Sequence, residues 1–212
     1  MNQALEKIYT QHHEQARGRG FVLMQKERGE FLRSGIKEGS HVLDIGCRDG
    51  GLTAEYIEKA GSVLGLDIDA GALAIAQQLG VETRQLDLNG EWGVDSNSFD
   101  HVVAAEVVEH LYYPDVVFRK IAEVLKPGGT LLGTVPNAFS LRNRMRYMTL
   151  TKRNTPLADP THINHFTVGE LTQLLEKHFD DVRIIGAGRL GLLAARFPQE
   201  FAFDLFFTGT AR

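Results

Sequence analysis

The chain has 212 residues, 43% of them hydrophobic and 24% charged, which is ordinary for a globular protein and enough for one well-buried domain. Its formal net charge of −4 gives no field that would attract nucleic acid, so we expect no nucleic-acid partner. No apolar run approaches the roughly 20 residues of a membrane-spanning helix, and the apolar stretch 201–207 is short and contains Asp204.

Residues 1–35 are predicted to form a polar helical arm that Gly18 and Gly20 break in two. Two interpretations stay open for this arm: a helix that packs on the domain, or a lid over a pocket. The first residues contain no apolar segment of the kind that a signal peptide needs, so we expect a cytoplasmic protein. The apolar positions of the arm are Phe21, Met24, Phe31 and Leu32.

From residue 36 onward, short apolar runs alternate with helical patterns. This alternation is typical of βαβ units and predicts an α/β domain over 36–212, with a mostly parallel sheet covered by helices on both faces. The predicted strands are 41–46, 62–67, 81–87, 99–106 and 128–136, and the predicted helices between them are 52–59, 70–79 and 115–125.

A basic insert at 137–160 interrupts this alternation. It carries five basic residues and no acid between Asn137 and Ala158. A solvated flap is one interpretation, and a surface that holds an anionic acceptor, such as a carboxylate, a phosphate or a lipid head group, is the other. The basic residues are Arg142, Arg144, Arg146, Lys152 and Arg153.

The C-terminal part is predicted to close the sheet. A helix follows Thr167, with Glu170 three residues later in the pattern of a capping box. The last two strand candidates are 181–188 and 201–209. Because no helical crossover between them is evident, we expect an antiparallel pair at the sheet edge, with residues 189–200 as the bridge.

A glycine hinge follows the first predicted strand in the stretch HVLDIGCRDGG, residues 41–51. In open α/β sheets, ligands bind beyond the carboxyl ends of the strands, where glycines let the backbone approach them. The spacing of Gly46 and Gly50 matches neither a phosphate loop nor a dinucleotide fingerprint. Asp44 and Asp49 would repel a pyrophosphate and favour a ligand that carries an ammonium and a sulfonium group.

Two further acids end the next strands. Asp67 lies about twenty residues after the hinge, where a carboxylate accepts hydrogen bonds from both hydroxyls of a ribose. Asp87 ends the third strand and is placed to accept from the exocyclic amine of an adenine, with Leu88 and Ile68 as apolar walls. The only cysteine, Cys47, excludes an intramolecular disulfide and favours a reducing compartment.

Five motifs in order, VLDIGCRDG, VLGLDID, RQLDLN, SFDHVVAAEVVEHL and LKPGGTLLGTVPN, resemble the class I S-adenosylmethionine-dependent methyltransferases over roughly residues 38–187. The nearest resemblance is to the methyltransferase type 11 or ubiquinone-biosynthesis O-methyltransferase-like subgroup. It implies a Rossmann-like seven-stranded sheet whose last strand is antiparallel.

The resemblance also implies a function: methyl transfer from S-adenosylmethionine to a small-molecule acceptor, at oxygen rather than nitrogen or carbon, with S-adenosylhomocysteine as product. The residues that would hold the cofactor are Asp44, Gly46, Cys47, Gly50, Asp67, Ile68, Asp87, Leu88 and Ala105.

Arg48 departs from the family pattern, which has a glycine at this position. If the position needs a positive φ, a bulky side chain there costs about 1 kcal/mol or more. We therefore expect either a relaxed backbone or an Arg48 side chain that turns outward and contacts another group.

The candidate catalytic residues follow the fourth strand. Glu106, Glu109 and His110 are spaced to share one face of a helical turn. His110 is suited to act as general base on an acceptor hydroxyl, and His165, in the stretch THINHFT, is the second catalytic candidate. The alternative is that His110 only caps the turn.

A divalent metal is implied by the same resemblance. A similar Glu-x-x-Glu-His stretch binds a divalent ion in the ubiquinone O-methyltransferases and in the small-RNA terminal-ribose methyltransferases. Glu106, Glu109 and His110 match it, and His162 or His165 would complete the ligand set. Many relatives carry a Glu-His pair without metal, so the use of a metal stays open.

Two other functions are compatible with parts of the sequence. An NAD-linked oxidoreductase would share the acid at Asp67, but the glycine spacing and the pair Asp44 and Asp49 argue against it. A non-catalytic subunit that binds S-adenosylmethionine or S-adenosylhomocysteine is supported by Arg48 in the hinge. The sequence gives no indication of the oligomeric state.

Overall fold

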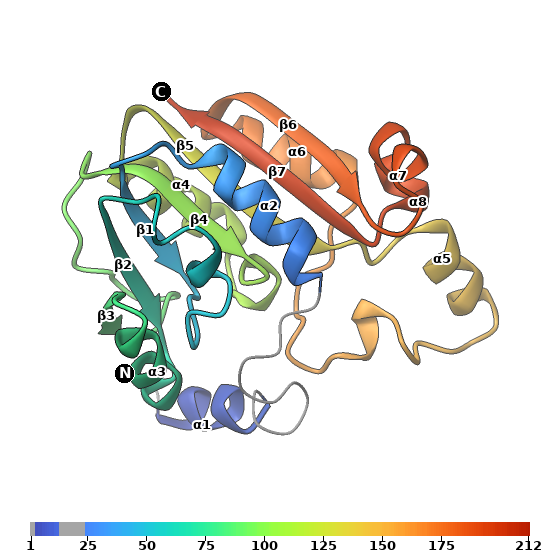
Figure 1. Ribbon diagram of the computed structural model, residues 1–212. Helices are drawn as coiled ribbons and strands as arrows, with labels where there is room; N and C mark the ends of the chain where they lie inside the picture. Colours follow the sequence, from blue (N-terminus) through green and yellow to red (C-terminus); the bar gives the residue numbers. More distant parts are fainter. Residues whose placement is uncertain (1–2, 13–23) are drawn as a thin grey trace.

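A computed structural model of the chain describes residues 3–12 and 24–212. Figure 1 shows one twisted sheet with helices on both of its faces. The predicted break of the N-terminal arm at Gly18 and Gly20, and the apolar position Phe21, lie outside the described residues. The two described helices of the arm are α1 (Gln3–His12) and α2 (Gln25–Gly35).

The sheet has seven strands in the order β3-β2-β1-β4-β5-β7-β6. All neighbours from β3 to β5 are parallel, and β7 is antiparallel to both β5 and β6. This confirms the predicted Rossmann-like sheet and its antiparallel edge pair. The strands are β1 (His41–Ile45), β2 (Ser62–Asp67), β3 (Glu82–Gln85), β4 (Phe99–Ala105), β5 (Leu125–Pro136), β6 (Phe179–Ala187) and β7 (Asp204–Ala211).

Each face of the sheet has its own apolar core. On one face, α2 and α3 (Ala70–Gln78) contribute Leu32 and Ala76 to a cluster that includes Val42 and Val103 of the sheet. On the other face, α4 (Pro114–Val124) and α6 (Val168–Glu176) contribute a larger cluster. Because both faces are covered, the central strands consist of nearly continuous apolar residues, which is why their positions were predictable.

The order of the strands positions the candidate site. The chain proceeds from β1 outward through β2 to β3, and then returns to β4 on the other side of β1. The carboxyl ends of β1 and β4 therefore flank a topological switch point, the place where open α/β sheets bind ligands.

The helix predicted at 52–59 is wrong. Only a short 3-10 helix, η2 (Thr53–Glu55), forms there, followed by turns. The hydroxyl groups of Thr53 and Tyr56 both donate to Asp44 Oδ2, each at 2.6 Å. These two bonds fold the segment back onto the end of β1 in place of a regular helix.

The predicted capping box is confirmed. The Thr167 side chain accepts from the Glu170 backbone N–H, and the Glu170 carboxylate accepts from the Thr167 backbone N–H. Within the basic insert the structure contains α5 (Leu141–Met148) and the short 3-10 helix η4 (Pro156–Ala158). The bridge between β6 and β7 contains α7 (Leu192–Arg196) and α8 (Pro198–Phe201).

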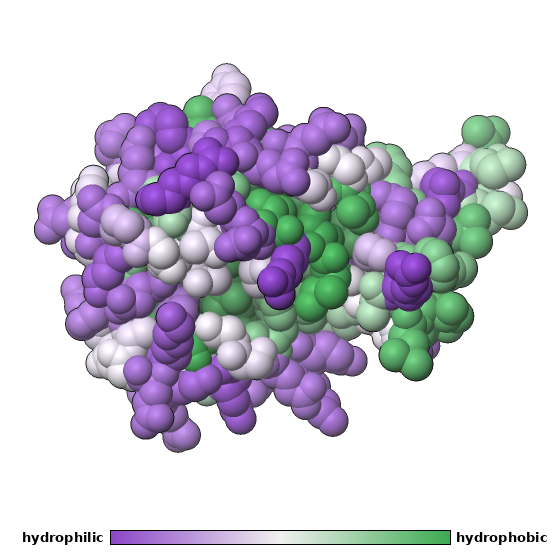
Figure 2. All heavy atoms as spheres, turned by 90° about the horizontal axis from the view of Figure 1, so that it is seen from above, coloured by the Kyte–Doolittle hydropathy of each residue, from purple (hydrophilic) through white to green (hydrophobic). Residues whose placement is uncertain are grey.

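The end of the molecule formed by α5, α7 and α8 carries apolar side chains on its surface (Figure 2). Met148, Leu150 and Leu192 are 76%, 97% and 88% exposed. The tip of the basic insert is thus at the surface, whereas its first residues, among them Asn137 and Ala138, are buried. Across the described residues, no helix has both the length and the apolar character needed to cross a membrane.

Gly133 in β5 lies where the sheet is tightly packed. A Cβ there would strike the ring of Phe207 and lie 2.8 Å from the Ala104 carbonyl oxygen. We expect Gly133→Ala to lower the free energy of unfolding by about 1–3 kcal/mol, measured by urea denaturation. Gly169→Ala in α6 is the control, because nothing lies within 4 Å of its added Cβ and alanine favours a helix. A Gly133→Ala protein as stable as the wild type would contradict this account of the packing.

Candidate functional site

One cleft opens at the carboxyl ends of β1, β2, β3 and β4. The loops after these strands form most of its wall, and α1 and α2 close the remaining side. The described residues that line it are Leu5, Tyr9, His12, Arg28, Asp44, Gly46, Cys47, Arg48, Asp49, Gly51, Leu52, Asp67, Ile68, Leu86, Asp87, Leu88, Asn89, Ala105, Glu106, Val107, His110 and Leu111.

The glycine hinge requires glycine at both predicted positions. Gly46 has φ of 72°, and a Cβ there would lie 2.6 Å from a methyl group of Val107. Gly50 has φ of 77°, and a Cβ there would lie 3.0 Å from a methyl group of Leu79. Gly46 lines the cleft, whereas Gly50 is not among the described lining residues and instead donates its N–H to the Cys47 carbonyl at 3.0 Å.

Arg48 adopts the left-handed conformation that the family's glycine would have, with φ of 51°. The backbone is therefore not relaxed. The side chain is only 16% exposed, and its guanidinium lies 3.7 Å from the Asp49 carboxylate. Its backbone N–H donates to Asp67 Oδ2 at 3.0 Å, so the residue that departs from the family pattern still holds the acid of the next strand.

Asp44 and Asp67 are buried carboxylates at the tips of adjacent strands. Burial raises the pKa of each to about 6, although hydrogen-bond donors partly oppose the shift. For Asp67 the donors are backbone N–H groups, including those of Asp69 and Arg48. For Asp44 they are the two hydroxyls that fold η2 back. Each carboxylate oxygen can still accept from a ligand, because it has more than one acceptor position.

The rest of the predicted cofactor wall is in place. Asp87, with Ile68 and Leu88, lines the cleft, as do Cys47 and Ala105. Asp87 Oδ1 accepts from both the backbone N–H and the side-chain amide of Asn89, each at 2.9 Å. Burial raises the pKa of the Cys47 thiol, so this residue forms part of the wall as a neutral thiol and not as a nucleophile.

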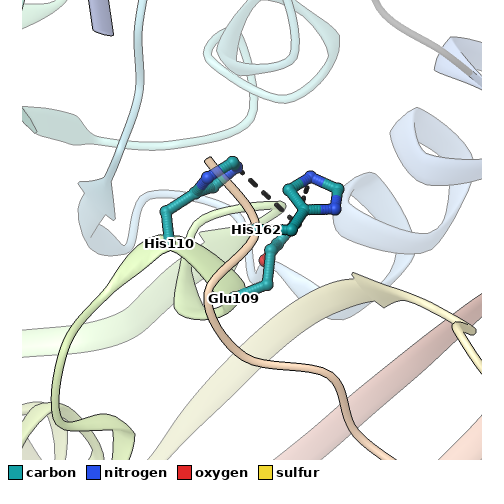
Figure 3. Close-up of side chains that lie close together, drawn as sticks. All are labelled: Glu109, His110 and His162. Atoms are coloured by element: carbon teal, nitrogen blue, oxygen red, sulfur yellow. Dashed lines mark ion pairs between the residues drawn. The ribbon is translucent and has the colours of Figure 1, made fainter. Parts of the chain in front are cut away.

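Glu109, His110 and His162 form a second group beside the acidic strand tips (Figure 3). Each histidine Nδ1 lies within hydrogen-bond distance of a backbone carbonyl, at 2.9 Å from Thr161 for His110 and 3.1 Å from Pro156 for His162. A carbonyl oxygen only accepts, so Nδ1 carries the proton in both rings. Each Nε2 then offers a lone pair, 3.9 and 4.0 Å from Glu109 Oε1.

This group can act chemically in two ways. A neutral histidine with a fixed Nδ1 proton can accept a proton at Nε2 as a general base. Two imidazole lone pairs and a carboxylate are also a donor set that divalent ions bind, and the backbone carbonyls on Nδ1 are the usual outer partners of metal-ligating histidines. The three ligand atoms lie within 4.8 Å of one another.

Glu106 does not share a face with Glu109 and His110, so that prediction is wrong. The turn after β4 is a short 3-10 helix, η3 (Val108–His110), and Glu106 precedes it with a left-handed φ of 56°. This conformation directs its carboxylate to Arg28, 2.7 Å away.

His110 lines the cleft, whereas Glu109, His162 and His165 are not among its described lining residues. Glu109 and His162 adjoin His110, and His165 is not part of that group. The ring centroid of His165 lies 6.5 Å from that of His162, and burial lowers the pKa of His165. The catalytic role of His165 stays a prediction. His162, whose ring centroid is 4.7 Å from that of His110, is the histidine of this loop that the fold brings to the site.

The N-terminal arm supplies residues that the motifs did not indicate. The Tyr9 hydroxyl donates to the His110 carbonyl at 3.0 Å, and His12 Nε2 lies 3.2 Å from Asp159. These contacts place α1 beside the cleft, and the lid interpretation of the arm stays a prediction. The polar pattern of residues 1–35 gave no signal for these particular side chains.

Comparisons with known proteins agree with this geometry. Residues 14–178 match the family model of a methyltransferase domain. A ubiquinone biosynthesis O-methyltransferase of Nitrosococcus oceani is 29% identical over 123 residues, which cover 53% of this chain and 52% of that protein. One of Xanthomonas oryzae pv. oryzae is 35% identical over 114 residues, covering 49% and 47%. The chain thus spans about half the length of the curated relatives it matches.

Solved structures show the same fold. A SAM-dependent methyltransferase of Thermotoga maritima, described as a possible histamine N-methyltransferase, superposes with a TM-score of 0.70 at 15% identity, covering 100% of both chains. A SAM-dependent methyltransferase from Archaeoglobus fulgidus gives a TM-score of 0.69 at 20% identity, covering 95% of this chain and 99% of that one. At these identities the likeness concerns the fold alone.

The left-handed backbone at Arg48 predicts different stabilities for two substitutions at this position. Arg48→Gly relieves the strain, whereas Arg48→Ala keeps it and removes the contact with Asp49. We expect the glycine variant to be more stable than the alanine variant by about 1 kcal/mol, measured as the difference in free energy of unfolding. Equal stability of the two variants would mean that the hinge is not strained at this residue.

Proposed function

The chain belongs to the methyltransferase domain family, and from this premise we propose that it transfers the methyl group of S-adenosylmethionine to a small-molecule acceptor. The observation that carries the proposal is the set of acids at the tips of three neighbouring strands, Asp44, Asp67 and Asp87, around one cleft with a glycine hinge. This arrangement is supported by the family match over residues 14–178.

The chemistry of the cleft suits this cofactor. Its described lining contains five acids and two arginines, which favours a cationic ligand and disfavours a pyrophosphate. Asp67 would hold the ribose hydroxyls and Asp87 the adenine amine. The bound cofactor supplies a methyl group that its positively charged sulfur has already activated.

The residues of the chain would contribute to methyl transfer in three ways. They orient the acceptor, exclude water and remove a proton. The contact of Tyr9 with the His110 backbone keeps α1 beside the cleft, which supports exclusion of water. His110 Nε2 would take the proton of an acceptor hydroxyl, because its Nδ1 is held in the protonated form by the Thr161 carbonyl.

Oxygen is the proposed acceptor atom. The relatives that the chain matches along about half of their length are named O-methyltransferases, and His110 is suited to accept a hydroxyl proton. An anionic group on the acceptor would be met by the basic side chains of α5. The sequence from Asn137 to Ala158 contains no acid, and Arg144 lies 4.0 Å from Glu200 of α8. A cytoplasmic location, inferred from the single cysteine, stays a prediction.

Binding of nucleotide cofactors, together with turnover, distinguishes the proposed function from an NAD-linked oxidoreductase and from a non-catalytic subunit. An NAD-linked oxidoreductase would bind NADH in this cleft, against the repulsion of its acids. A non-catalytic subunit would bind S-adenosylmethionine and S-adenosylhomocysteine without turning over any acceptor. The first titration to make is therefore the wild-type protein with S-adenosylhomocysteine and with NADH.

We expect S-adenosylhomocysteine to bind and NADH not to bind, measured by isothermal titration calorimetry. Asp67→Asn should lower the affinity for S-adenosylhomocysteine about tenfold or more, because the ribose hydroxyls lose a charged hydrogen-bond acceptor. Asp95→Asn, which removes an exposed carboxylate outside the described lining, should leave the affinity unchanged. Unchanged binding by the Asp67→Asn protein would refute the proposed ribose site.

The same titration has a pH signature. Asp67 has a pKa of about 6 in the protein, so it is protonated, and loses its charge, as the pH falls through this value. Affinity for S-adenosylhomocysteine should therefore decrease from neutral to acidic pH in the wild type. The Asp67→Asn protein should show a shallower decrease, which Asp44 still causes because its pKa is also about 6.

His110→Gln should lower kcat by about 100-fold or more while leaving S-adenosylhomocysteine affinity unchanged, because only the proton acceptor is lost. Turnover is measured as S-adenosylhomocysteine formed with a panel of phenols, catechols and hydroxy acids. A His110→Gln protein with wild-type turnover would exclude His110 as the base.

Binding of a divalent ion is the second candidate role of Glu109, His110 and His162. The observation that favours it is that the Nε2 lone pairs of both histidines lie near Glu109. If an ion is bound, Glu109→Gln and His162→Gln should lose as much activity as His110→Gln, and EDTA should remove the activity of the wild type. Calorimetry with Mn²⁺ or Zn²⁺ should then show binding. If only His110→Gln is inactive and EDTA has no effect, His110 acts without a metal.

A further inference from the structure

A buried ion triad connects three distant parts of the chain beside the cleft. The Arg28 guanidinium, from α2, lies 2.7 Å from Glu106 Oε2, just after β4. The same guanidinium donates through Nη2 and Nε to Asp204 Oδ2, at 2.6 and 3.1 Å, at the start of β7. Arg28 and Asp204 are 176 positions apart in the sequence, so only the fold brings them together.

The triad contains one cation and two anions and is nearly without solvent. The side chains of Arg28, Glu106 and Asp204 are 3%, 9% and 0% exposed. Burial opposes the charge on Arg28, but Glu106 and Asp204 outweigh this effect and raise its pKa. The guanidinium therefore stays charged, and the triad leaves an excess of negative charge at this place.

Glu106 is held in a conformation that its own backbone disfavours. Its φ of 56° is left-handed, which costs a residue with a side chain about 1–2 kcal/mol. Its backbone N–H donates to the Thr134 carbonyl at 2.9 Å, and its Oε1 accepts from the Thr134 hydroxyl at 3.1 Å. Strain of this kind persists where the surroundings fix a functional geometry.

Only two of the three residues reach the cleft. Arg28 and Glu106 line it, whereas Asp204 is not part of the lining among the described residues. Asp204 lies behind Arg28 and neutralises it. Without Asp204, the positive charge of Arg28 would cancel the charge of Glu106 in the wall of the cleft.

We propose that Arg28 and Asp204 are positioning residues that fix Glu106 in the cleft wall, and that the triad keeps one net negative charge there to distinguish the cationic cofactor from its neutral product. The inference rests on the proposed function. When the methyl group passes to the acceptor, a C–O bond forms with an electron pair of the acceptor oxygen, whose proton goes to His110, and the C–S bond breaks with its electron pair left on sulfur. The sulfonium thereby becomes an uncharged thioether, and the attraction to the triad ends.

The inference predicts a selective loss of affinity. One unit charge acting across a partly buried cleft corresponds to about tenfold in binding of a cation. Asp204→Asn and Glu106→Gln each remove one negative charge and keep the size of the side chain. Both variants should bind S-adenosylmethionine about tenfold more weakly and S-adenosylhomocysteine within about twofold of the wild type.

The experiment is isothermal titration calorimetry of both ligands with the wild type and the two variants. Sinefungin, an analogue with an amine in place of the sulfonium methyl, serves as a second cationic probe. Glu123→Gln is the matched control, because this carboxylate lies on α4 with its side chain 52% exposed. The control should keep the wild-type ratio of the two affinities. Thermal melts establish that each variant is folded, and Glu106→Gln carries the test if Asp204→Asn is not.

The outcomes separate this inference from the proposed function. If the variants weaken both ligands equally, or neither, the triad is only structural and the inference is overturned. If the wild type binds neither ligand, the proposed function itself fails. A tenfold loss of affinity for the two cationic ligands alone, seen in each folded variant and not in Glu123→Gln, supports the inference.

Discussion

The burial of carboxylates at the ends of β1 and β2 is the constraint on which the rest of the site depends. Removing Asp44 and Asp67 from water raises their pKa values, and donors must offset part of that cost. Those donors come from the segments that follow the strands. Asp44 takes two hydroxyls from the region of η2, and Asp67 takes backbone N–H groups from the hinge and from the start of α3. The acids therefore shape the loops that surround the cleft, and a change in their charge alters the loops as well as the affinity for a ligand.

The parts of the fold that could be predicted are those whose cause is local. Buried parallel strands are apolar on both faces, so β1, β2 and β4 are evident in the sequence. The capping box of α6 depends on two residues three positions apart. The segment after the hinge was not predictable in the same way, because its conformation depends on Asp44, which belongs to the preceding strand. Arg28 and Asp204 could not be paired from the sequence, since nothing in either segment indicates a partner at the other end of the chain. Their pairing also accounts for an acid among the aromatic residues of β7.

In the candidate site, too, the features with a local cause are predictable and those that depend on distant residues are not. The strand tips and the glycine hinge follow from the motifs, and the structure brings most of them to one cleft. The choice between His162 and His165 does not follow, because both belong to one loop and only the fold decides which ring faces His110. The His162 ring is oriented by the Pro156 carbonyl, which is supplied by η4 within the insert. The contributions of α1 were equally beyond the sequence, because a polar helix offers many side chains and no motif indicates which of them reach the cleft.

The acidic strand tips and the histidine group are connected by the packing of Val107 on the glycine hinge. The side chain of Val107 packs so closely on Gly46 that a Cβ there has no room. Val107 stands between Glu106, which the triad holds, and the η3 turn that carries Glu109 and His110. The turn also contacts the arm, because the Tyr9 hydroxyl donates to the His110 carbonyl. Glycine at position 46 consequently has two purposes: it permits a close backbone approach to a ligand, and it lets the residue between the two groups pack against the hinge. The hinge and the turn that carries His110 are therefore packed against each other, and a fixed arrangement of this kind is the geometric condition that transfer to a hydroxyl requires.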